Sequence, residues 1–297
     1  NLAVLWARGN GAAAVEATAH QSLLAPCRQV GSVLEMAPDS DGRLSAEALK
    51  QALASRPRIV ACCHVNNETG VIQDLFAIRN AMDGCGADAA FVVDGAQSFG
   101  RVAIPWRAAR IDMLTVAGRK IGGPAGVAAV IVRRGFEPRP LLYGGGQQQG
   151  VRPGTVDTVG VLEFAAAARL AAAERKSAAT VVAERNRACR AGLEEILGDR
   201  LRVLSPERAS PYILCCTVKG CQGAVLVRML AERGIVVGTG SACAAESPEP
   251  SHVLTAMGLT EREARGAVRI SFGRATTQGD VQRLLAGMKE AVAECVG

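Results

Sequence analysis

The hydrophobic pattern of the first 135 residues alternates between two kinds of segment. Five short apolar runs, rich in Val, Ile and Ala, are too short for helices and predict buried strands. These runs are residues 12–18, 58–65, 89–96, 112–118 and 126–134. Between them, residues 45–55 and 74–86 carry apolar positions at helical spacing. This alternation predicts an α/β fold, with a mostly parallel sheet covered by helices.

The second half of the chain has a different pattern. Residues 156–197 are a long alanine-rich tract with charges and no proline, which predicts one long helix or two. Short apolar runs and helical patterns follow, and they predict a smaller α+β unit. The expected strands are 200–205, 212–218, 235–240 and 267–273, and the expected helices are 223–234, 250–258, 260–266 and 278–294. We therefore expect a large domain over 1–155, and a linking helix with a small C-terminal domain over 156–297.

Composition narrows the class of protein. Of the 297 residues, 49% are hydrophobic and 21% charged, which is typical of a globular protein. Neither a run of about 18 apolar residues nor a signal peptide is evident, so we expect a cytoplasmic protein without a membrane partner. The net charge is +6, but the arginines are scattered and aromatics make up only 3%, so we expect no nucleic acid. The ten cysteines form no paired C-x-x-C sets, and no metal site is predicted.

Polar residues follow four of the predicted strands of the first half. In a parallel sheet, the carboxyl ends of the strands meet at one edge, where ligands bind. The residues at these ends are His20, Asn66, Asn67, Asp94, Gln97, Arg119 and Lys120. This pattern predicts a binding site at that edge.

Two of these residues suggest a specific chemistry. Only five of the 34 basic residues are lysines, and Lys120 lies among apolar and glycine residues. An amine can lose its proton and attack a carbonyl, whereas a guanidinium effectively cannot. Asp94 ends an apolar run, where a carboxylate favours a cationic partner. Alone, Asp94 equally fits a turn or helix cap, and Lys120 a solvated lysine; together they favour pyridoxal phosphate, which needs a lysine and a carboxylate.

Cys243 lies in an unusual setting for a cysteine. The surrounding stretch, "GTGSACAAESPEP", consists of small and polar residues, whereas free cysteines are usually buried among apolar ones. The pattern predicts a surface loop that presents a thiol for chemistry. A buried cysteine is the remaining alternative.

Six motifs, taken in order, resemble those of a known family. They are "HVNNETGVIQD", "VDGAQSFGR", "AGRKIGGPAGV", "GVRPGT", "GSACAAESPEPSHVLTAMG" and "VRISFGRATT". The chain is similar to the cysteine desulfurases of the NifS and IscS type, in the fold-type I pyridoxal phosphate superfamily, from about His20 to its end. The resemblance implies pyridoxal 5'-phosphate as cofactor, L-cysteine as substrate, a homodimer, and a sulfur-acceptor protein such as an iron–sulfur scaffold.

The resemblance also implies roles for the cofactor-binding residues. Lys120 is expected to bind the cofactor covalently and to act as the general base. Asp94 is expected to pair with the pyridinium nitrogen, and Gln97 to bind the phenolic oxygen. His20 is expected to stack on the ring, and Arg119 to lie near the phosphate, where a guanidinium is a suitable partner.

The remaining roles concern the substrate and the partner subunit. Asn67, near the cofactor, and Arg269 are expected to hold the substrate carboxylate, because a guanidinium offers a planar fork to two oxygens. Cys243 is expected to take the sulfur as a persulfide. Thr155 is expected to reach the phosphate in the partner subunit, or to cap the long helix, or both. The other two histidines, His64 and His252, are expected to be structural.

The sequence departs from the family pattern at several places. It begins at Asn1, after the Gly-Ala-Thr-Glu segment that binds the phosphate in the family, and we expect a fragment of a complete enzyme. Arg119 replaces a histidine, Ala117 replaces a frequent serine, and Gln147–Gln149 replace a His-Glu-Arg run. Two alternative functions stay open: a selenocysteine lyase, and a catalytically silent homologue that acts as an interaction partner.

Overall fold

The computed structural model describes residues 1–7, 11–240 and 250–296. The chain divides into two compact units. Unit 1 comprises 1–38, 44–65 and 73–175, and unit 2 comprises 39–43, 66–72 and 176–297. In the described part of the chain, no helix is both long and apolar enough to cross a membrane.

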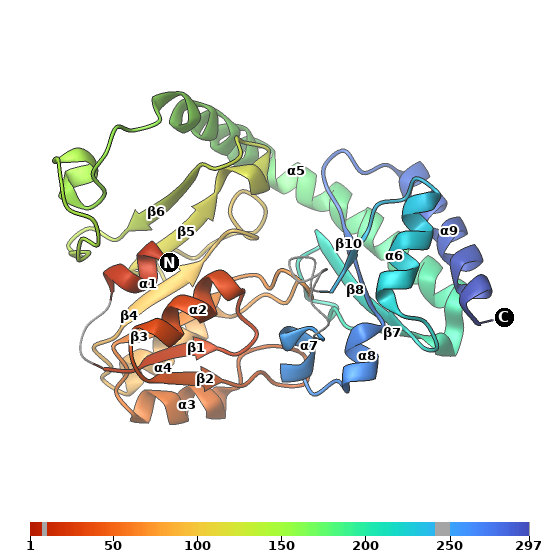
Figure 1. The fold of residues 1–297 in the computed structure, drawn as a ribbon, viewed down its shortest axis with the longest axis horizontal. Helices are drawn as coiled ribbons and strands as arrows, with labels where there is room; N and C mark the ends of the chain where they lie inside the picture. Colours follow the sequence, from red (N-terminus) through yellow and green to blue (C-terminus); the bar gives the residue numbers. More distant parts are fainter. Residues whose placement is uncertain (8–10, 241–249, 297) are drawn as a thin grey trace. The chain divides into compact units, whose positions relative to one another are not determined.

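Unit 1 is built on a six-stranded sheet in the order β2-β1-β3-β4-β5-β6 (Figure 1). The strands are β1 (Ala13–Glu16), β2 (Val33–Met36), β3 (Ile59–Cys63), β4 (Ala90–Asp94), β5 (Met113–Ala117) and β6 (Ala128–Val132). The first five strands are parallel, and β6 pairs with β5 in the antiparallel sense. The mostly parallel sheet predicted from the apolar runs is confirmed.

Burial on both faces explains why these strands are continuously apolar. Every residue of β3 is buried. Because side chains alternate along a strand, Ile59 and Ala61 pack into the core on one face, and Val60 and Cys62 into the core on the other.

Four helices accompany this sheet: the first precedes β1, and the other three connect successive strands from β1 to β4. They are α1 (Leu2–Trp6), α2 (Gln21–Gln29), α3 (Ala46–Ala54) and α4 (Leu75–Gly84). The Ser45 hydroxyl accepts a hydrogen bond from the Ala48 N–H at the start of α3, and Asp74 accepts two at the start of α4. These two helices match the predicted ones, whereas α1, α2 and β2 were not predicted.

Helix α5 (Thr158–Leu197) is one uninterrupted helix of 40 residues. Phe164, near its start, packs into a core of unit 1, and Val182 and Leu193, nearer its end, pack into the core of unit 2. The same helix therefore contributes to both hydrophobic cores. Of the two predicted possibilities, the single helix is correct.

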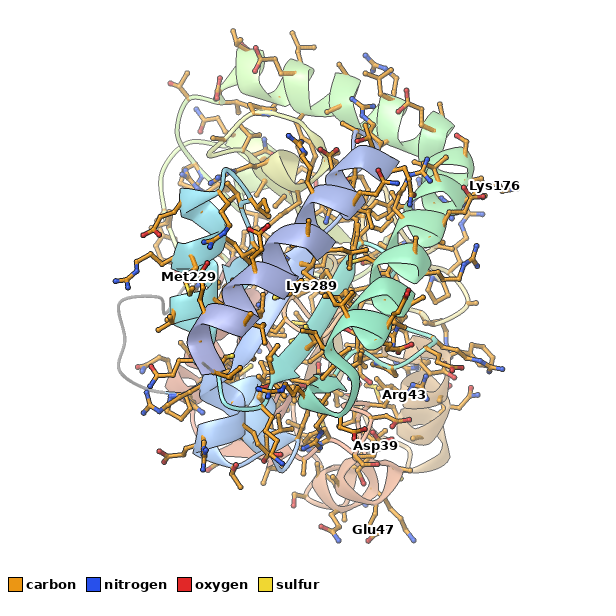
Figure 2. The ribbon with its side chains drawn as sticks, turned by 90° about the vertical axis from the view of Figure 1, so that its right-hand side faces the viewer. Asp39, Arg43, Glu47, Lys176, Met229 and Lys289 are labelled. Carbon is orange, nitrogen blue, oxygen red and sulfur yellow. The ribbon has the colours of Figure 1, made fainter. Side chains whose placement is uncertain are left out.

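Unit 2 contains a four-stranded antiparallel sheet in the order β7-β8-β10-β9. Its elements are β7 (Leu201–Val203), β8 (Ile213–Val218), α6 (Gly223–Glu232), β9 (Gly238–Thr239), α7 (His252–Ala256), α8 (Glu261–Arg265), β10 (Ala267–Ser271) and α9 (Gln278–Val296). Helices α6 and α9 contact each other, and Figure 2 labels Met229 on α6 and Lys289 on α9. Their apolar faces join α5 in one core, and a smaller core lies against α7 and α8.

Residues 66–72 belong to unit 2 although they follow β3 in the sequence. The Ser205 hydroxyl donates to the Thr69 carbonyl at 2.6 Å and accepts from the Cys215 N–H at 2.8 Å. The Ser210 N–H donates to the Gly70 carbonyl at 2.7 Å. These bonds fix residues 66–72 against β8 and the turn that precedes it.

We predict that Ser205→Ala destabilises the protein by about 1–3 kcal/mol, because the buried Thr69 carbonyl and Cys215 N–H then lose their partner. Urea unfolding of the variant and the parent measures the difference. The exposed Ser40→Ala is the control, with an expected change within about 0.5 kcal/mol. Equal effects of the two substitutions would contradict the proposed anchoring.

Candidate active site

The carboxyl edge of the large sheet carries most of the predicted cofactor-binding residues. His20 follows β1, Asp94 ends β4, and Lys120 lies in the short helix η1 (Gly118–Ile121) that directly follows β5. These three strands are parallel, and Asp94 pairs in register with Cys63 of β3 and Thr115 of β5. Their ends therefore lie at one edge of the sheet, as expected for a ligand site.

Asp94 has one carboxylate oxygen left for a ligand. Its Oδ1 accepts hydrogen bonds from the Ala96 N–H at 2.8 Å and the Thr115 hydroxyl at 3.3 Å. Both of these bonds from described residues use Oδ1, so Oδ2 can accept a hydrogen bond from a ligand. The side chain thus stabilises the turn that follows it, which is the alternative role expected from the sequence. Its second oxygen also fits a protonated ring nitrogen.

Gln97 and Lys120 are joined by an arginine that the sequence analysis did not single out. Arg101 donates from Nη1 to the Gln97 Oε1 at 3.1 Å and from Nη2 to the Lys120 carbonyl at 2.5 Å. It therefore fixes the backbone that carries the lysine relative to the Gln97 side chain. In the sequence, Arg101 follows Gln97 by four residues, and this spacing could have indicated that the two side chains meet.

His20 caps helix α2. The ring Nδ1 accepts a hydrogen bond from the Ser22 backbone N–H at 3.1 Å. The backbone N–H of His20 donates to the Cys63 Sγ at 3.4 Å. A ring nitrogen that accepts from a backbone N–H carries no proton, so the ring proton is on Nε2. The cap and the Cys63 contact hold the ring at the end of β1.

A buried carboxyl group supports the turn before His20. Glu16 is fully buried and accepts from the Thr18 hydroxyl and the Gln73 amide, both at 2.6 Å, and from the Cys63 N–H at 3.0 Å. Burial raises the pKa of the Glu16 carboxyl, although these hydrogen bonds oppose the shift. This role was not predicted, because a charged residue within a strand more often faces solvent.

The residues expected near the phosphate lie at exposed positions. Arg119 is exposed beside Lys120, and Thr155 is exposed ahead of α5. The Gln147 side chain accepts from the Gly154 N–H at 3.3 Å, next to Thr155. At the start of α5, Asp157 Oδ1 accepts from the Gly160 N–H at 3.0 Å. Asp157 caps this helix, so the interpretation of Thr155 as its cap is wrong.

Three further residues at which the sequence departs from the expected pattern can be placed. Ala117 ends β5 and carries no hydroxyl at the point where the family often has a serine. Gln148 and Gln149, in the turn η2 (Gln147–Gly150), adopt left-handed φ angles of 52° and 59°. Such angles are uncommon for residues other than glycine, and we find no structural explanation for them here.

In unit 2, Asn67 and Arg269 lie together. Arg269 Nη1 donates to the Asn67 carbonyl at 3.1 Å, which leaves the other guanidinium N–H groups for a ligand. The Asn67 Oδ1 is buried and, within the described residues, has no hydrogen-bond partner. A buried acceptor without a donor is costly, so it fits a site that a ligand completes.

Glu68 is buried next to this pair and was not predicted. Only 2% of its surface is exposed, and the Ser251 hydroxyl donates to its Oε2 at 2.6 Å. Burial raises the pKa of the Glu68 carboxyl to about 7, while the Ser251 hydrogen bond and the Arg269 charge act to lower it. Glu68 therefore titrates near neutral pH.

Three predicted residues remain, two histidines expected to be structural and one cysteine. His64 is buried, and burial lowers its pKa to about 4, so it is neutral at physiological pH. His252 is the first residue of α7. Cys243 lies outside the described residues. Among the residues that the structure describes, no group of three or more His, Cys, Asp or Glu could hold a metal ion.

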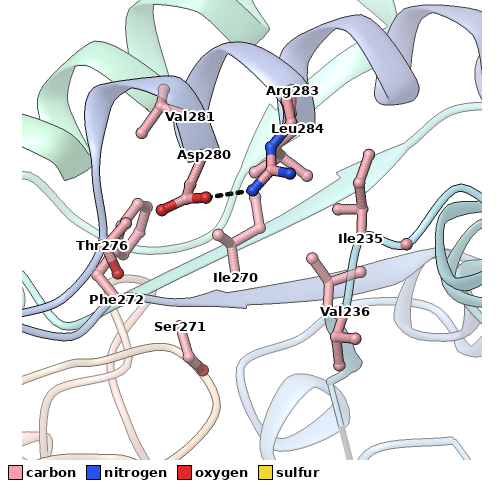
Figure 3. A pocket seen from close by; sticks show the side chains of 12 residues that line it. Ile235, Val236, Ile270, Ser271, Phe272, Thr276, Asp280, Val281, Arg283 and Leu284 are labelled. Atoms are coloured by element: carbon pink, nitrogen blue, oxygen red, sulfur yellow. Dashed lines mark hydrogen bonds and ion pairs between the residues drawn. The ribbon is translucent and has the colours of Figure 1, made fainter.

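One hollow of about 220 Å³ in unit 2 contains none of the predicted site residues (Figure 3). Its wall is mostly apolar, with Ile235, Val236 and Ile270, and an ion pair joins Asp280 to Arg283 at 2.5 Å. The hollow therefore offers no group suited to the predicted chemistry.

Comparisons with known proteins identify the family of the chain. Residues 3–284 match the family model "Aminotransferase class-V". A cysteine desulfurase of Cereibacter sphaeroides is 35% identical over 274 residues, which cover 90% of this chain and 69% of that protein.

Two solved structures extend the comparison. A NifS-like protein from Rickettsia africae has a TM-score of 0.87 at 26% identity, covering 96% of this chain and 76% of that one. The structure titled "SspA in complex with cysteine" has a TM-score of 0.75 at 30% identity, covering 93% and 77%.

The lysine and aspartate at one sheet edge, the spare carboxylate oxygen and the buried unpaired acceptor fit the cofactor and substrate of such enzymes. This chain therefore belongs to the class-V aminotransferases, pyridoxal phosphate-dependent enzymes of fold type I.

Proposed function

We propose that this protein is a cysteine desulfurase, which converts L-cysteine to L-alanine and transfers the sulfur to Cys243. The observation that carries the proposal is the pairing of β4 with β5. It brings Asp94 to the same sheet edge as the strand that leads directly into Lys120. The similarity to named cysteine desulfurases supports the choice of reaction within the family.

Residues of unit 1 bind the cofactor and move protons. When bound, pyridoxal phosphate supplies an electron sink that stabilises negative charge at the substrate Cα. The free oxygen of Asp94 holds the proton on the ring nitrogen, and Gln97 and His20 position the ring. The Lys120 amine removes the proton from the substrate Cα and returns protons to the product. Arg119, at an exposed position, adds positive charge for the phosphate.

Residues of unit 2 bind the substrate carboxylate. Arg269 uses one N–H group on the Asn67 carbonyl and keeps the others for the two carboxylate oxygens. The buried Asn67 Oδ1, which has no partner among the described residues, is available to accept a hydrogen bond from an N–H or O–H donor of the bound ligand. The related SspA structure, solved with cysteine, supports this class of substrate.

Sulfur transfer requires a thiol of the protein. The Cys243 thiolate attacks the substrate sulfur, and a new S–S bond forms as the substrate Cβ–S bond breaks. The carbon fragment takes up protons and leaves as L-alanine, while Cys243 keeps the sulfur as a persulfide. A sulfur-acceptor protein, such as an iron–sulfur scaffold, then removes it.

We also propose a homodimer formed through unit 1. The first half of α5 exposes Val159, Leu162 and Leu170, and the preceding segment exposes Leu142 and Tyr143. Tyr143 is 85% exposed and Leu162 69% exposed, which is unusual for large apolar side chains outside an interface. In such a dimer, the exposed Thr155 reaches the cofactor phosphate of the partner.

The cysteines favour a reducing compartment. Nine of them lie within the described residues, and all nine are free thiols. Disulfides are rare in the cytosol and common in secreted proteins. We therefore propose that the protein works in the cytoplasm.

Lys120→Ala is predicted to lose both covalent cofactor attachment and turnover, with alanine formation reduced at least 100-fold. Borohydride reduction followed by peptide mapping is expected to find the cofactor on Lys120 in the parent. Lys176→Ala, at an exposed position of α5, is the matched control and is expected to behave like the parent. A label on another lysine would exclude this mechanism.

Cys243→Ser is predicted to keep cofactor and cysteine binding but to lose sulfide release in the presence of dithiothreitol, because a hydroxyl cannot accept and store sulfur. The control is Cys85→Ser, which changes an exposed cysteine of unit 1. If Cys243→Ser still turned over selenocysteine at the parent rate and the parent did not turn over cysteine, the protein would be a selenocysteine lyase.

Leu162→Glu is predicted to raise the dimer dissociation constant at least 100-fold, because it buries a charge in an apolar interface. Val181→Glu changes an exposed residue of the same helix in unit 2 and serves as the control. Sedimentation velocity over a range of concentrations measures both. An unchanged dimer in Leu162→Glu would place the interface elsewhere.

A further inference from the structure

Glu68 stands out because nothing in the proposed reaction uses it. It is a carboxyl group with 2% exposure, and it forms no ion pair with any described residue. A buried carboxylate is costly without a compensating charge, so its presence requires an explanation.

The hydrogen bonds around Glu68 have a defined direction. The Ser251 Oγ accepts from the Leu254 N–H at 3.3 Å, as the cap of α7, and donates its single proton to Glu68 Oε2 at 2.6 Å. Oε2 is therefore an acceptor, and a proton on Glu68 resides on Oε1.

Glu68 is held firmly at this position. A Cβ atom placed on Gly240 would lie 3.3 Å from Glu68 Oε2, so this oxygen packs closely against the Gly240 backbone. The main chain of the preceding residue, Asn67, accepts the hydrogen bond from Arg269. The carboxyl group is thus held by Ser251 and packed against Gly240, one residue after the backbone that Arg269 contacts.

Among the described residues, few charged and titratable groups influence Glu68. Two of them lie on neighbouring strands: Arg269 on β10 and Cys215 on β8, and these two residues pair with each other across the strands. The α7 side contributes the neutral Ser251, and Gly240 contributes no side chain. Burial together with the Glu68 charge raises the pKa of the Cys215 thiol, so this thiol stays neutral near pH 7. Arg269 is therefore the one cation acting on Glu68 among these groups.

We propose that Glu68 is a positioning residue for Arg269, and that it takes up a proton from solvent when a substrate carboxylate binds the guanidinium. This inference rests on the proposed role of Arg269. Without substrate, ionised Glu68 balances the Arg269 charge. A bound substrate carboxylate neutralises the Arg269 charge in place of Glu68 and repels the Glu68 carboxylate. Glu68 then favours its neutral, protonated form.

The consequence for substrate binding has a definite sign. Burial already raises the pKa of Glu68 to about 7 in the free protein, and a second carboxylate raises it further. Binding is therefore coupled to proton uptake, and affinity falls as the pH rises above about 7. A coupling of one pKa unit corresponds to a tenfold change in affinity.

The test uses binding of L-alanine, the expected product, to the cofactor-loaded protein between pH 6 and pH 9. Glu68→Gln mimics the neutral form, so it is expected to bind like the parent at pH 6 and about tenfold more tightly than the parent at pH 9. Identical pH profiles for the two proteins would overturn the inference. Titration of the ligand itself is common to both proteins and cancels in the ratio.

Two variants separate this inference from the proposed function. Arg269→Gln is expected to weaken L-alanine binding more than tenfold at every pH. If it binds like the parent, the proposed role of Arg269 is wrong. If Arg269 is required but Glu68→Gln retains the parent profile, only the role of Glu68 is wrong.

A stability measurement checks the titration without ligand. Because the pKa of Glu68 is raised from 4.5 in the unfolded chain to about 7, the folded protein binds more protons between these values. The parent's unfolding temperature should therefore fall relative to Glu68→Gln from pH 4.5 to pH 7 and then stay constant. A constant difference over this range would contradict the raised pKa.

If Glu68→Gln does not fold, Ser251→Ala provides a second test of the Glu68 titration. Removal of a hydrogen bond that lowers the pKa of Glu68 raises this pKa. The pH at which L-alanine binding weakens should then move upward. An unchanged transition would show that another group causes it.

Discussion

Hydrogen bonds between residues 66–72 and the rest of unit 2 determine where the proposed substrate-binding groups lie. This segment leaves the large-sheet unit after β3 and is fixed by Ser205 and Ser210, which bond to the Thr69 and Gly70 carbonyls. Within the segment, Asn66 Oδ1 accepts from the Glu68 and Thr69 N–H groups, at 2.9 Å and 3.0 Å. Most polar backbone groups of this segment have a specific partner, which restrains the backbone around Asn67 and Glu68.

The carboxyl groups of Asp94 and Glu68 lie in different environments. Asp94 is half-buried, and one of its oxygens accepts hydrogen bonds from the Ala96 N–H and the Thr115 hydroxyl. Glu68 is buried almost completely, which favours the neutral form. Carboxyl groups of similar chemistry therefore have different proposed purposes: Asp94 pairs with a bound ring, and Glu68 changes its charge as the site fills.

Local sequence patterns were sufficient for elements whose stability is local. The continuously apolar β3 and β4 were predicted because burial on both faces leaves no other composition. Strand β2 was not predicted, since it is an edge strand with an exposed Glu35. Helix α2 was not predicted either, because it contains Pro26 and begins with a histidine cap, neither of which is a usual helix signal.

The site shows the same division. Lys120 and Asp94 could be recognised because each closes an apolar run. Glu68 could not, because its hydrogen-bond partner Ser251 is 183 residues away and Arg269 is 201 residues away in the sequence, so its burial results from tertiary contacts alone. His20 differs again: as a helix cap it occupies a place where Ser, Asp or Asn would stabilise α2 better. Selection for heat resistance alone would favour those residues at this position, so a laboratory-evolved thermostable form that lost this imidazole would reveal a conflict between durability and catalysis.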